Sequence, residues 1–233
     1  MNREKLLVER ERIGTWGKLN QERLKTTLRF AGEKILEVGC ADGTLTDLLH
    51  QKGYDICGVD CLFSKTWKPA LRKYFVVADA VNLPFESNSF DTVLAFEVLE
   101  HLRDVDQGVE EMVRVCRQNL VITTPDAELY PYLRESGLVY FPWADRTHVN
   151  FFTGGKLQNF LINKGLSIKY FSRINPVFPE RILLESFGLP ARLARFLQKF
   201  LRHLPRRNKF RMTLLVVAGK PEKMEIINTE SSR

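Results

Sequence analysis

The chain of 233 residues lacks the long apolar run that a membrane-spanning helix needs, and no apolar signal core follows its first residues. Cysteine is scarce, with four thiols that form neither a C-x-x-C pair nor the dense spacing of a disulfide framework. These absences predict a cytoplasmic protein with reduced, packed thiols. A metal pair formed by Cys57 and Cys61 is the less favoured interpretation.

The composition is that of a globular protein, with 44% hydrophobic and 27% charged residues, and the length favours one elaborated domain. The net charge of +7 is distributed unevenly. Residues 181–211 hold nine lysines and arginines and one acid, Glu185, and without them the net charge falls from +7 to −1. The basic character therefore belongs to one insertion.

Short apolar runs alternate with helical patterns, which predicts an α/β fold with a doubly wound, mostly parallel sheet. The expected strands are Ile35–Val38, Asp55–Asp60, Tyr74–Asp79, Thr92–Phe96, Asn119–Thr123, Leu166–Ile174 and Met212–Ala218. The expected helices are Thr44–Lys52, Val105–Cys116 and Gly155–Lys164. The last two strands flank the basic insertion, and an antiparallel ending is open to them.

The most informative stretch is residues 34–49, where a short apolar run passes through a small-residue turn into a helical pattern. Backbone amides at such a helix N-terminus can approach a nucleotide-like ligand. A dinucleotide fingerprint would need two further glycines where Ala41 and a threonine stand. The pattern is instead acid-x-Gly-x-small-x-Gly, made by Glu37, Gly39, Ala41 and Gly43.

This pattern resembles the first motif of class I S-adenosylmethionine-dependent methyltransferases, and the resemblance extends over most of residues 34–174. It implies a Rossmann-like, seven-stranded methyltransferase fold with a helical insertion before the last strand, and S-adenosyl-L-methionine as cofactor. It places Asp60 at the ribose hydroxyls and Asp79 at the adenine amino group. The implied cofactor-binding residues are Glu37, Gly39, Cys40, Ala41, Gly43, Asp60, Cys61, Asp79, Ala80 and Phe96.

The apolar and charge patterns, together with the resemblance, predict how the chain is divided. An N-terminal helical extension covers residues 1–30, and the methyltransferase domain covers residues 31–221. Within that domain lies the basic amphipathic insertion, residues 176–211. A flexible tail, residues 222–233, follows.

A second constellation follows the fourth expected strand, in the sequence Glu97-Val-Leu-Glu100-His101. If this turn is helical, the two carboxylates and the imidazole share one face. Such a donor set suits a divalent ion such as Mg²⁺, Mn²⁺ or Zn²⁺. His148, on the loop after the fifth strand, is a fourth candidate ligand.

The Glu-x-x-Glu-His turn is similar to two metal-dependent branches of the family. These are the O-methyltransferases of ubiquinone biosynthesis and the small-RNA 3′-terminal 2′-O-methyltransferases, the latter with a downstream histidine. We predict methyl transfer to oxygen of a small or lipid-linked acceptor, with RNA 2′-O-methylation as the alternative. Without a metal, His101 or His148 would act as general base, or the turn would only shape the loop.

The basic insertion contains an amphipathic helical pattern beginning at Pro190, with basic residues on the side opposite the apolar stripe. Three interpretations stay open: a lid over the substrate pocket, peripheral contact of residues 190–211 with an anionic membrane, and contact with RNA phosphates, which is the least favoured. A contrasting hypothesis is a non-catalytic module that binds a membrane or partner.

Overall fold

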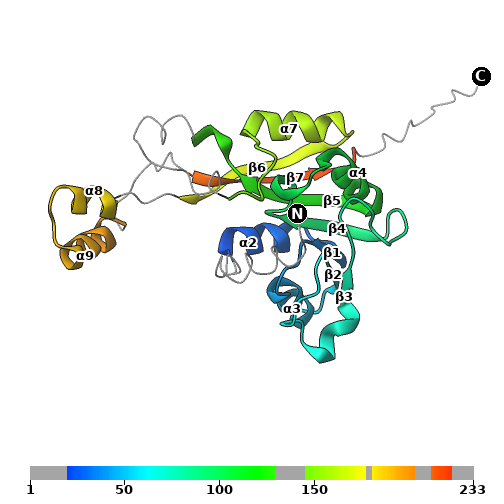
Figure 1. Ribbon diagram of the computed structural model, residues 1–233. Coiled ribbons are helices and arrows are strands. Elements are labelled where there is room, and N and C mark those ends of the chain that lie inside the picture. The colour runs from blue at the N-terminus through cyan, green and yellow to red at the C-terminus, as the bar shows by residue number, and fades with distance from the viewer. Residues whose placement is uncertain (1–19, 130–144, 177–179, 203–210, 222–233) are drawn as a thin grey trace, which may run out of the picture.

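The computed structural model describes residues 20–129, 145–176, 180–202 and 211–221 (Figure 1). In these residues a seven-stranded sheet has the order β3-β2-β1-β4-β5-β7-β6. The strands are β1 (Lys34–Val38), β2 (Asp55–Asp60), β3 (Phe75–Val77), β4 (Phe90–Phe96), β5 (Cys116–Pro125), β6 (Ser167–Pro176) and β7 (Arg211–Gly219). The helices are α2 (Gln21–Phe30), α3 (Thr44–Gln51), α4 (Val105–Val115), α7 (Gly154–Asn163), α8 (Glu180–Ser186) and α9 (Ala191–Arg202).

The sheet is parallel from β3 to β5 and ends in antiparallel pairs. β7 runs antiparallel to both β5 and β6, so β5 and β6 point in the same direction. The doubly wound fold and the antiparallel ending are thereby confirmed. Because β1, β2, β4, β5 and β6 share one direction, their carboxyl ends lie at a single edge of the sheet, where α/β folds of this kind place their sites.

The strands are apolar on both faces because helices cover both sides of the sheet. In β1, Leu36 and Val38 join the core beneath α4 and α7, while Ile35 joins the opposite core with Leu49 of α3. Figure 1 shows α4 and α7 on one side of the sheet and α2 and α3 on the other. This two-sided burial explains why the central strands read as continuous apolar runs.

Most boundaries differ from the expected ones by one or two residues, and two of the differences follow from the neighbouring elements. The third strand is shorter than Tyr74–Asp79, because a 3-10 helix, η1 (Pro69–Tyr74), occupies the connection and takes Tyr74. The fifth strand begins at Cys116, directly after α4, so this residue belongs to the strand rather than to the helix.

The N-terminal helix α2 begins at Asn20, whose side chain accepts hydrogen bonds from the amides of Glu22 and Arg23. The remainder of the expected extension, residues 1–19, the expected tail and residues 203–210 of the insertion lie outside the described residues. Among the helices described, none combines the length and apolar character needed to cross a bilayer.

The insertion between β6 and β7 contains α8 and α9, which pack on each other. This helical pair, the α8–α9 hairpin (residues 180–202), projects away from the sheet beyond the end of β6 (Figure 1). The amphipathic pattern after Pro190 correctly predicts α9. In the structure the hairpin stands beside the body of the molecule rather than over it as a lid.

Candidate active site

The small-residue turn after β1 lies at the carboxyl edge of the sheet and is held by backbone hydrogen bonds. The amides of Gly39 and Cys40 donate to the carbonyl of Val59, over 2.8 and 3.1 Å. Gly39 has φ 74°, and a Cβ atom there would lie 2.5 Å from Val98 Cγ2. Glycine is therefore required at this position for both conformation and space.

Ala41 occupies the middle position of the turn with φ 48°, in the left-handed region that an alanine side chain disfavours. Its amide donates to Asp60 Oδ2 over 2.9 Å. This bond holds the alanine in the conformation that a glycine would adopt without strain. The departure from glycine at residue 41 is therefore accommodated by an acid from the neighbouring strand.

Asp60 ends β2 and is only 2% exposed. Besides the bond from Ala41, its carboxylate accepts a hydrogen bond from the amide of Leu62 over 3.0 Å. The backbone amide of Ala78, after β3, donates to the Asp60 carbonyl. Asp60 therefore joins the ends of three neighbouring segments, and contact with a ribose stays a prediction.

Glu37 is the buried acid of the turn, and the hydroxyl of Thr46 in α3 donates to it. Burial raises the pKa of Glu37 to about 7, and the charges of Asp42 and Asp60 act in the same direction, partly offset by the Thr46 bond. Glu37 thus connects β1 with α3 from inside the fold.

The other expected cofactor residues lie around the same edge. Asp79 is exposed and accepts a hydrogen bond from the amide of Val81, with Ala80 half-buried beside it. Cys40 is buried, whereas Cys61 is exposed. Phe96 ends β4, and the guanidinium of Arg23 lies 5.6 Å from its ring centre. Their roles in cofactor binding stay predictions.

The turn after β4 is helical over its last three residues and not over Glu97. The structure has a 3-10 helix, η2 (Leu99–His101), and Glu97 precedes it with φ 54°. The carboxylate of Glu97 forms an ion pair with Arg23 of α2. Sequence reasoning missed Arg23 because it lies 74 positions away.

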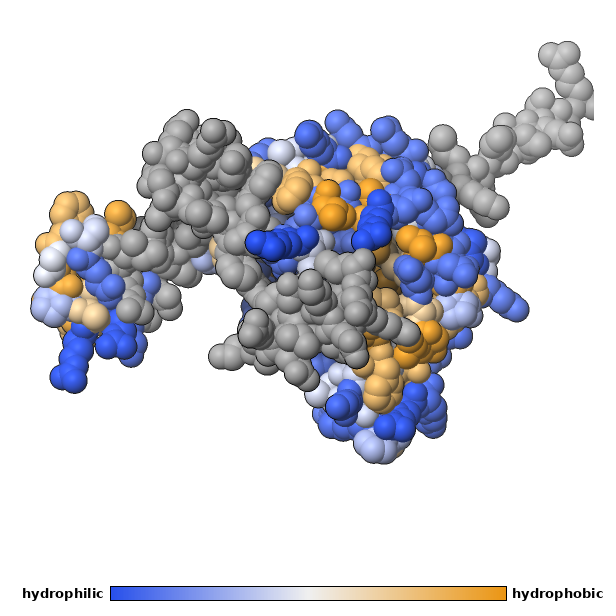
Figure 2. All heavy atoms as spheres, viewed as in Figure 1, coloured by the Kyte–Doolittle hydropathy of each residue, from blue (hydrophilic) through white to orange (hydrophobic). Residues whose placement is uncertain are grey.

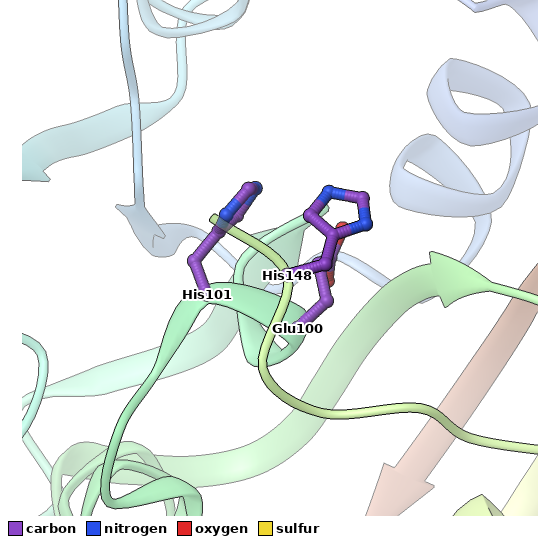
Figure 3. Close-up of side chains that lie close together, drawn as sticks. All are labelled: Glu100, His101 and His148. Atoms are coloured by element: carbon purple, nitrogen blue, oxygen red, sulfur yellow. The ribbon is translucent and has the colours of Figure 1, made fainter. Parts of the chain in front are cut away.

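The group that converges consists of Glu100, His101 and His148, whose candidate ligand atoms lie within 4.8 Å of one another (Figure 3). The two histidine rings meet edge to face at 4.6 Å. Glu97 is not part of this group. The expected convergence therefore holds for Glu100 and His101, with His148 as the third member in place of Glu97.

Glu100 is 1% exposed, and within the described residues neither of its carboxylate oxygens forms a hydrogen bond of normal geometry. Nδ1 of His148 is buried without a partner in the same sense. Burial, followed by the charge of Glu97, raises the pKa of Glu100 well above its ordinary value. The Thr124 hydroxyl and the Glu100 amide are near enough to lower this pKa slightly. Unpaired buried polar atoms are costly, so this cluster is a candidate ligand site.

The loop that carries His148 is fixed onto η2 by backbone hydrogen bonds. The amides of Val149 and Asn150 donate to the Glu100 carbonyl over 2.8 and 3.2 Å. The Asn150 side chain donates to the Leu99 carbonyl over 2.9 Å and also to that of Leu102. These bonds place His148 beside His101 although 47 positions separate the two in the chain.

Asp145 and Thr147 support the two histidines and were missed by the sequence reasoning. Thr147 Oγ1 donates to Asp145 Oδ1 over 2.6 Å and lies 2.9 Å from His101 Nδ1. Because the hydroxyl proton is directed to Asp145, the proton of the second bond belongs to His101 Nδ1, which leaves the lone pair on Nε2. Burial alone would raise the pKa of Asp145, but the Thr147 bonds and the nearby histidines lower it below its ordinary value.

Comparisons with known proteins point to a methyltransferase. A family model described as a methyltransferase domain matches residues 36–122. Ubiquinone biosynthesis O-methyltransferase, mitochondrial, of Rattus norvegicus is 29% identical over 160 residues, which cover 60% of this chain and 46% of that protein. Methyltransferase GfsG of Streptomyces halstedii is 35% identical over 97 residues, covering 37% of this chain and 35% of that protein.

Among solved structures, 1,6-didemethyltoxoflavin-N1-methyltransferase of Burkholderia thailandensis, with bound S-adenosylhomocysteine, has a TM-score of 0.61 at 14% identity and covers 94% of this chain and 87% of that chain. The chain carries a class I S-adenosylmethionine-dependent methyltransferase domain. It spans less than half the length of the curated relatives described above.

The matched segment of the methyltransferase domain contains the glycine turn, Asp60, Asp79 and the Glu100–His101 pair. The loop with His148 and the α8–α9 hairpin lie beyond it. The domain match therefore accounts for the cofactor edge, and the remaining features have to be interpreted from their own geometry.

Proposed function

We propose that this protein is an S-adenosylmethionine-dependent methyltransferase that methylates an oxygen atom of a small or lipid-linked acceptor with the help of a divalent cation. The observation that carries this proposal is the buried carboxylate of Glu100, unpaired in the described structure, beside His101 and His148. The similarity to ubiquinone O-methyltransferases over 160 residues supports oxygen as the methylated atom.

The glycine turn supports cofactor binding through its shape. The close approach of Val98 to Gly39 and the bonds from Ala41 and Leu62 to Asp60 hold the turn in one conformation before any ligand arrives. The cofactor supplies a methyl group that is already activated, so the protein mainly has to orient the acceptor and exclude water. The turn and the acids of β1 and β2 would hold the nucleoside and amino-acid parts.

The cluster of Glu100, His101 and His148 fits a divalent cation because it offers one carboxylate and two imidazoles. In the described structure the carboxylate oxygens of Glu100 and Nδ1 of His148 are buried and form no hydrogen bond of normal geometry. Glu100, His101 and His148 would hold the ion. A bound cation would lower the pKa of an acceptor hydroxyl and orient it. Asp145 and Thr147 would keep His101 in the tautomer with its lone pair on Nε2.

An RNA 2′-O-methyltransferase is the second candidate. The position of His148 beside Glu100 and His101 favours it, since that branch of the family also carries a downstream histidine. Both candidate functions would use a cation that binds two neighbouring hydroxyl oxygens of the acceptor. They differ in the molecule that carries these hydroxyls. Vicinal diols are therefore the first acceptor class to test, as an aromatic diol and as an RNA 3′ end.

The test is calorimetric binding of S-adenosylhomocysteine and of Mn²⁺ to the wild type and to the variants Glu100→Gln and Glu97→Gln. We expect all three proteins to bind the cofactor product. Mn²⁺ binding should be lost in Glu100→Gln and retained in Glu97→Gln, because Glu97 is paired with Arg23 outside the cluster. Absent cofactor binding would refute the methyltransferase function, and Mn²⁺ binding unchanged by Glu100→Gln would refute the metal site alone.

A further inference from the structure

The α8–α9 hairpin carries apolar side chains that no other described part of the chain covers. Helix α9 has an inner row that faces α8, in which Ala194 is fully buried and Leu197 and Leu201 are half-buried. A second row, here called the outer row, lies beside it on the helix surface. The outer row consists of Leu193, Phe196 and Phe200, which are 47%, 67% and 61% exposed.

Helix α8 and the turn after it extend this apolar surface. Leu183 is 52% exposed and Phe187 is 82% exposed. Together with the outer row, the hairpin thus presents three phenylalanines and two leucines to solvent on a part of the molecule that projects from the sheet (Figure 2). Clustered exposure of large apolar side chains is typical of a binding surface rather than of an ordinary surface.

A third row on α9 is basic and borders the outer row on the side away from α8. Arg192, Arg195 and Lys199 recur at i, i+3 and i+7, as the outer row does, and all three are exposed. Figure 2 shows the hydrophobic and the hydrophilic side chains of the projection gathered on different sides. A helix with parallel apolar and basic rows matches a surface that is apolar inside and anionic at its boundary.

We propose that the α8–α9 hairpin is an interfacial anchor that binds anionic phospholipid bilayers, with the outer row in the acyl boundary and the basic row at the phosphates. The charge of the insertion supports this occupant, because residues 181–211 carry the whole positive excess of the chain. A second copy of the chain would bring two like-charged rows together. RNA would use the phenylalanines for stacking but would gain nothing from Leu183 and Leu193.

The position of the hairpin gives the anchor a consequence for the site. The hairpin follows the carboxyl end of β6, which points in the same direction as the carboxyl ends of β4 and β5. Glu100, His101 and the glycine turn lie at that same edge. A bilayer bound by the hairpin would therefore lie on the side of the molecule where an acceptor enters. The anchor itself does not depend on the proposed function.

The test measures partition of the full chain onto vesicles of phosphatidylglycerol and of phosphatidylcholine by flotation. We expect binding to the anionic vesicles, weak binding to the neutral ones, and a loss of about tenfold or more for Phe196→Ser/Phe200→Ser on the anionic vesicles. Arg192→Gln/Arg195→Gln/Lys199→Gln should remove most of the preference for anionic lipid. Ile162→Ser, at an apolar position on α7 that is 51% exposed, is the control and should bind as the wild type does.

Three results would overturn the anchor. The first is equal vesicle binding by the wild type and the double phenylalanine variant. The second is binding to a single-stranded RNA oligonucleotide without vesicle binding. The third is a dimer in sedimentation that the double variant abolishes, again without vesicle binding. Circular dichroism melting and S-adenosylhomocysteine affinity should not change in the variants, since the substituted side chains are exposed and distant from the glycine turn.

Discussion

Two parts of the same sheet edge differ in how their buried polar groups are satisfied. Around the glycine turn, Asp60 accepts from two backbone amides and Glu37 accepts from Thr46. Around η2, the carboxylate of Glu100 and one nitrogen of His148 are buried without a partner in the described structure. Around the glycine turn the buried carboxylates are therefore hydrogen-bonded within the protein. Around η2 the buried carboxylate and imidazole are of the kinds that bind a ligand, and they have hydrogen-bonding atoms to spare.

The difference is informative because the two parts are in direct contact. Val98, at the start of the turn that carries Glu100, packs where a Cβ atom of Gly39 would be. A network whose hydrogen bonds are all made, such as the glycine turn, is rigid. A rigid turn can keep the adjacent Glu100 cluster in place although its buried polar atoms without hydrogen bonds are destabilising. We infer that the glycine turn positions the cluster as well as the cofactor.

The largest effect is expected from removing the unsatisfied carboxylate. If Glu100 holds the proposed cation, Glu100→Gln should lower methyl transfer by more than about a hundredfold, because loss of a metal ligand exceeds the effect of losing a supporting residue. Activity is measured with a saturating acceptor and Mn²⁺. Glu97→Gln should lose far less activity. Equal losses of activity in the two variants would mean that Glu100 has no role in catalysis that Glu97 lacks.

The next effect concerns the pH dependence of stability without ligand. The folded pKa of Glu37, about 7, lies above its unfolded value of 4.5, so its stabilising contribution is complete below pH 4.5 and is lost as the pH rises toward 7. This loss is about 3 kcal/mol for a fully buried group. Urea unfolding at pH 5 and pH 7.5 should show that Glu37→Gln removes a decline of this size. Glu100, whose pKa is also raised, contributes a decline in both proteins, so a decline in the variant equal to that of the wild type would contradict the assignment.

Asp60→Asn tests the satisfied network at its centre. The amide side chain can accept from only one of the two backbone donors, so we expect a loss of about 2 kcal/mol in the free energy of unfolding. Affinity for S-adenosylhomocysteine should fall with it, because the turn loses its support. Asp79→Asn, at an exposed position, is the control and should change stability little. Unchanged stability in Asp60→Asn would show that the turn does not need the acid.

Thr147→Val sharpens the comparison by removing the hydroxyl that bridges Asp145 and His101. We expect about a fivefold loss of kcat with unchanged cofactor affinity, since one hydrogen bond that orients an imidazole is worth about 1 kcal/mol. Thr147→Ser retains the hydroxyl and should restore most of the activity. A loss of cofactor affinity in Thr147→Val would instead indicate a general structural role.

The smallest effect is expected at Ala41. Its left-handed backbone suits glycine, so Ala41→Gly should stabilise the protein by about 0.5–1 kcal/mol in thermal unfolding. Ala80→Gly, at a residue without a positive φ, should destabilise it instead. A destabilising Ala41→Gly would show that the bond to Asp60 already removes the strain.

Much of the fold follows from local patterns. The apolar runs of β1, β2 and β4 and the helical pattern after Gly43 predict their elements closely, because strand and helix periods are properties of neighbouring residues. Boundaries near η1 and Cys116 are less predictable, since hydrogen bonds with adjacent strands decide where pairing stops. The glycine turn is recognisable for the same local reason.

The second cluster is only half visible in the chain. Glu100 and His101 are adjacent, so their proximity follows from the sequence. His148, Asp145 and Thr147 come from a distant loop, and their place depends on the bonds of Val149 and Asn150 to η2. Glu97 is close in sequence yet leaves the cluster, because its left-handed backbone and Arg23 direct its side chain elsewhere.

The sequence by itself therefore determined the α/β class, the glycine turn and the presence of a basic amphipathic helix, since each depends on residues within a few positions of one another. Only the tertiary structure decided which acid stands with the two histidines, how Asp60 holds Ala41, and where the apolar row of α9 lies. These depend on contacts between segments far apart in the chain, and such contacts leave no periodic pattern in the sequence.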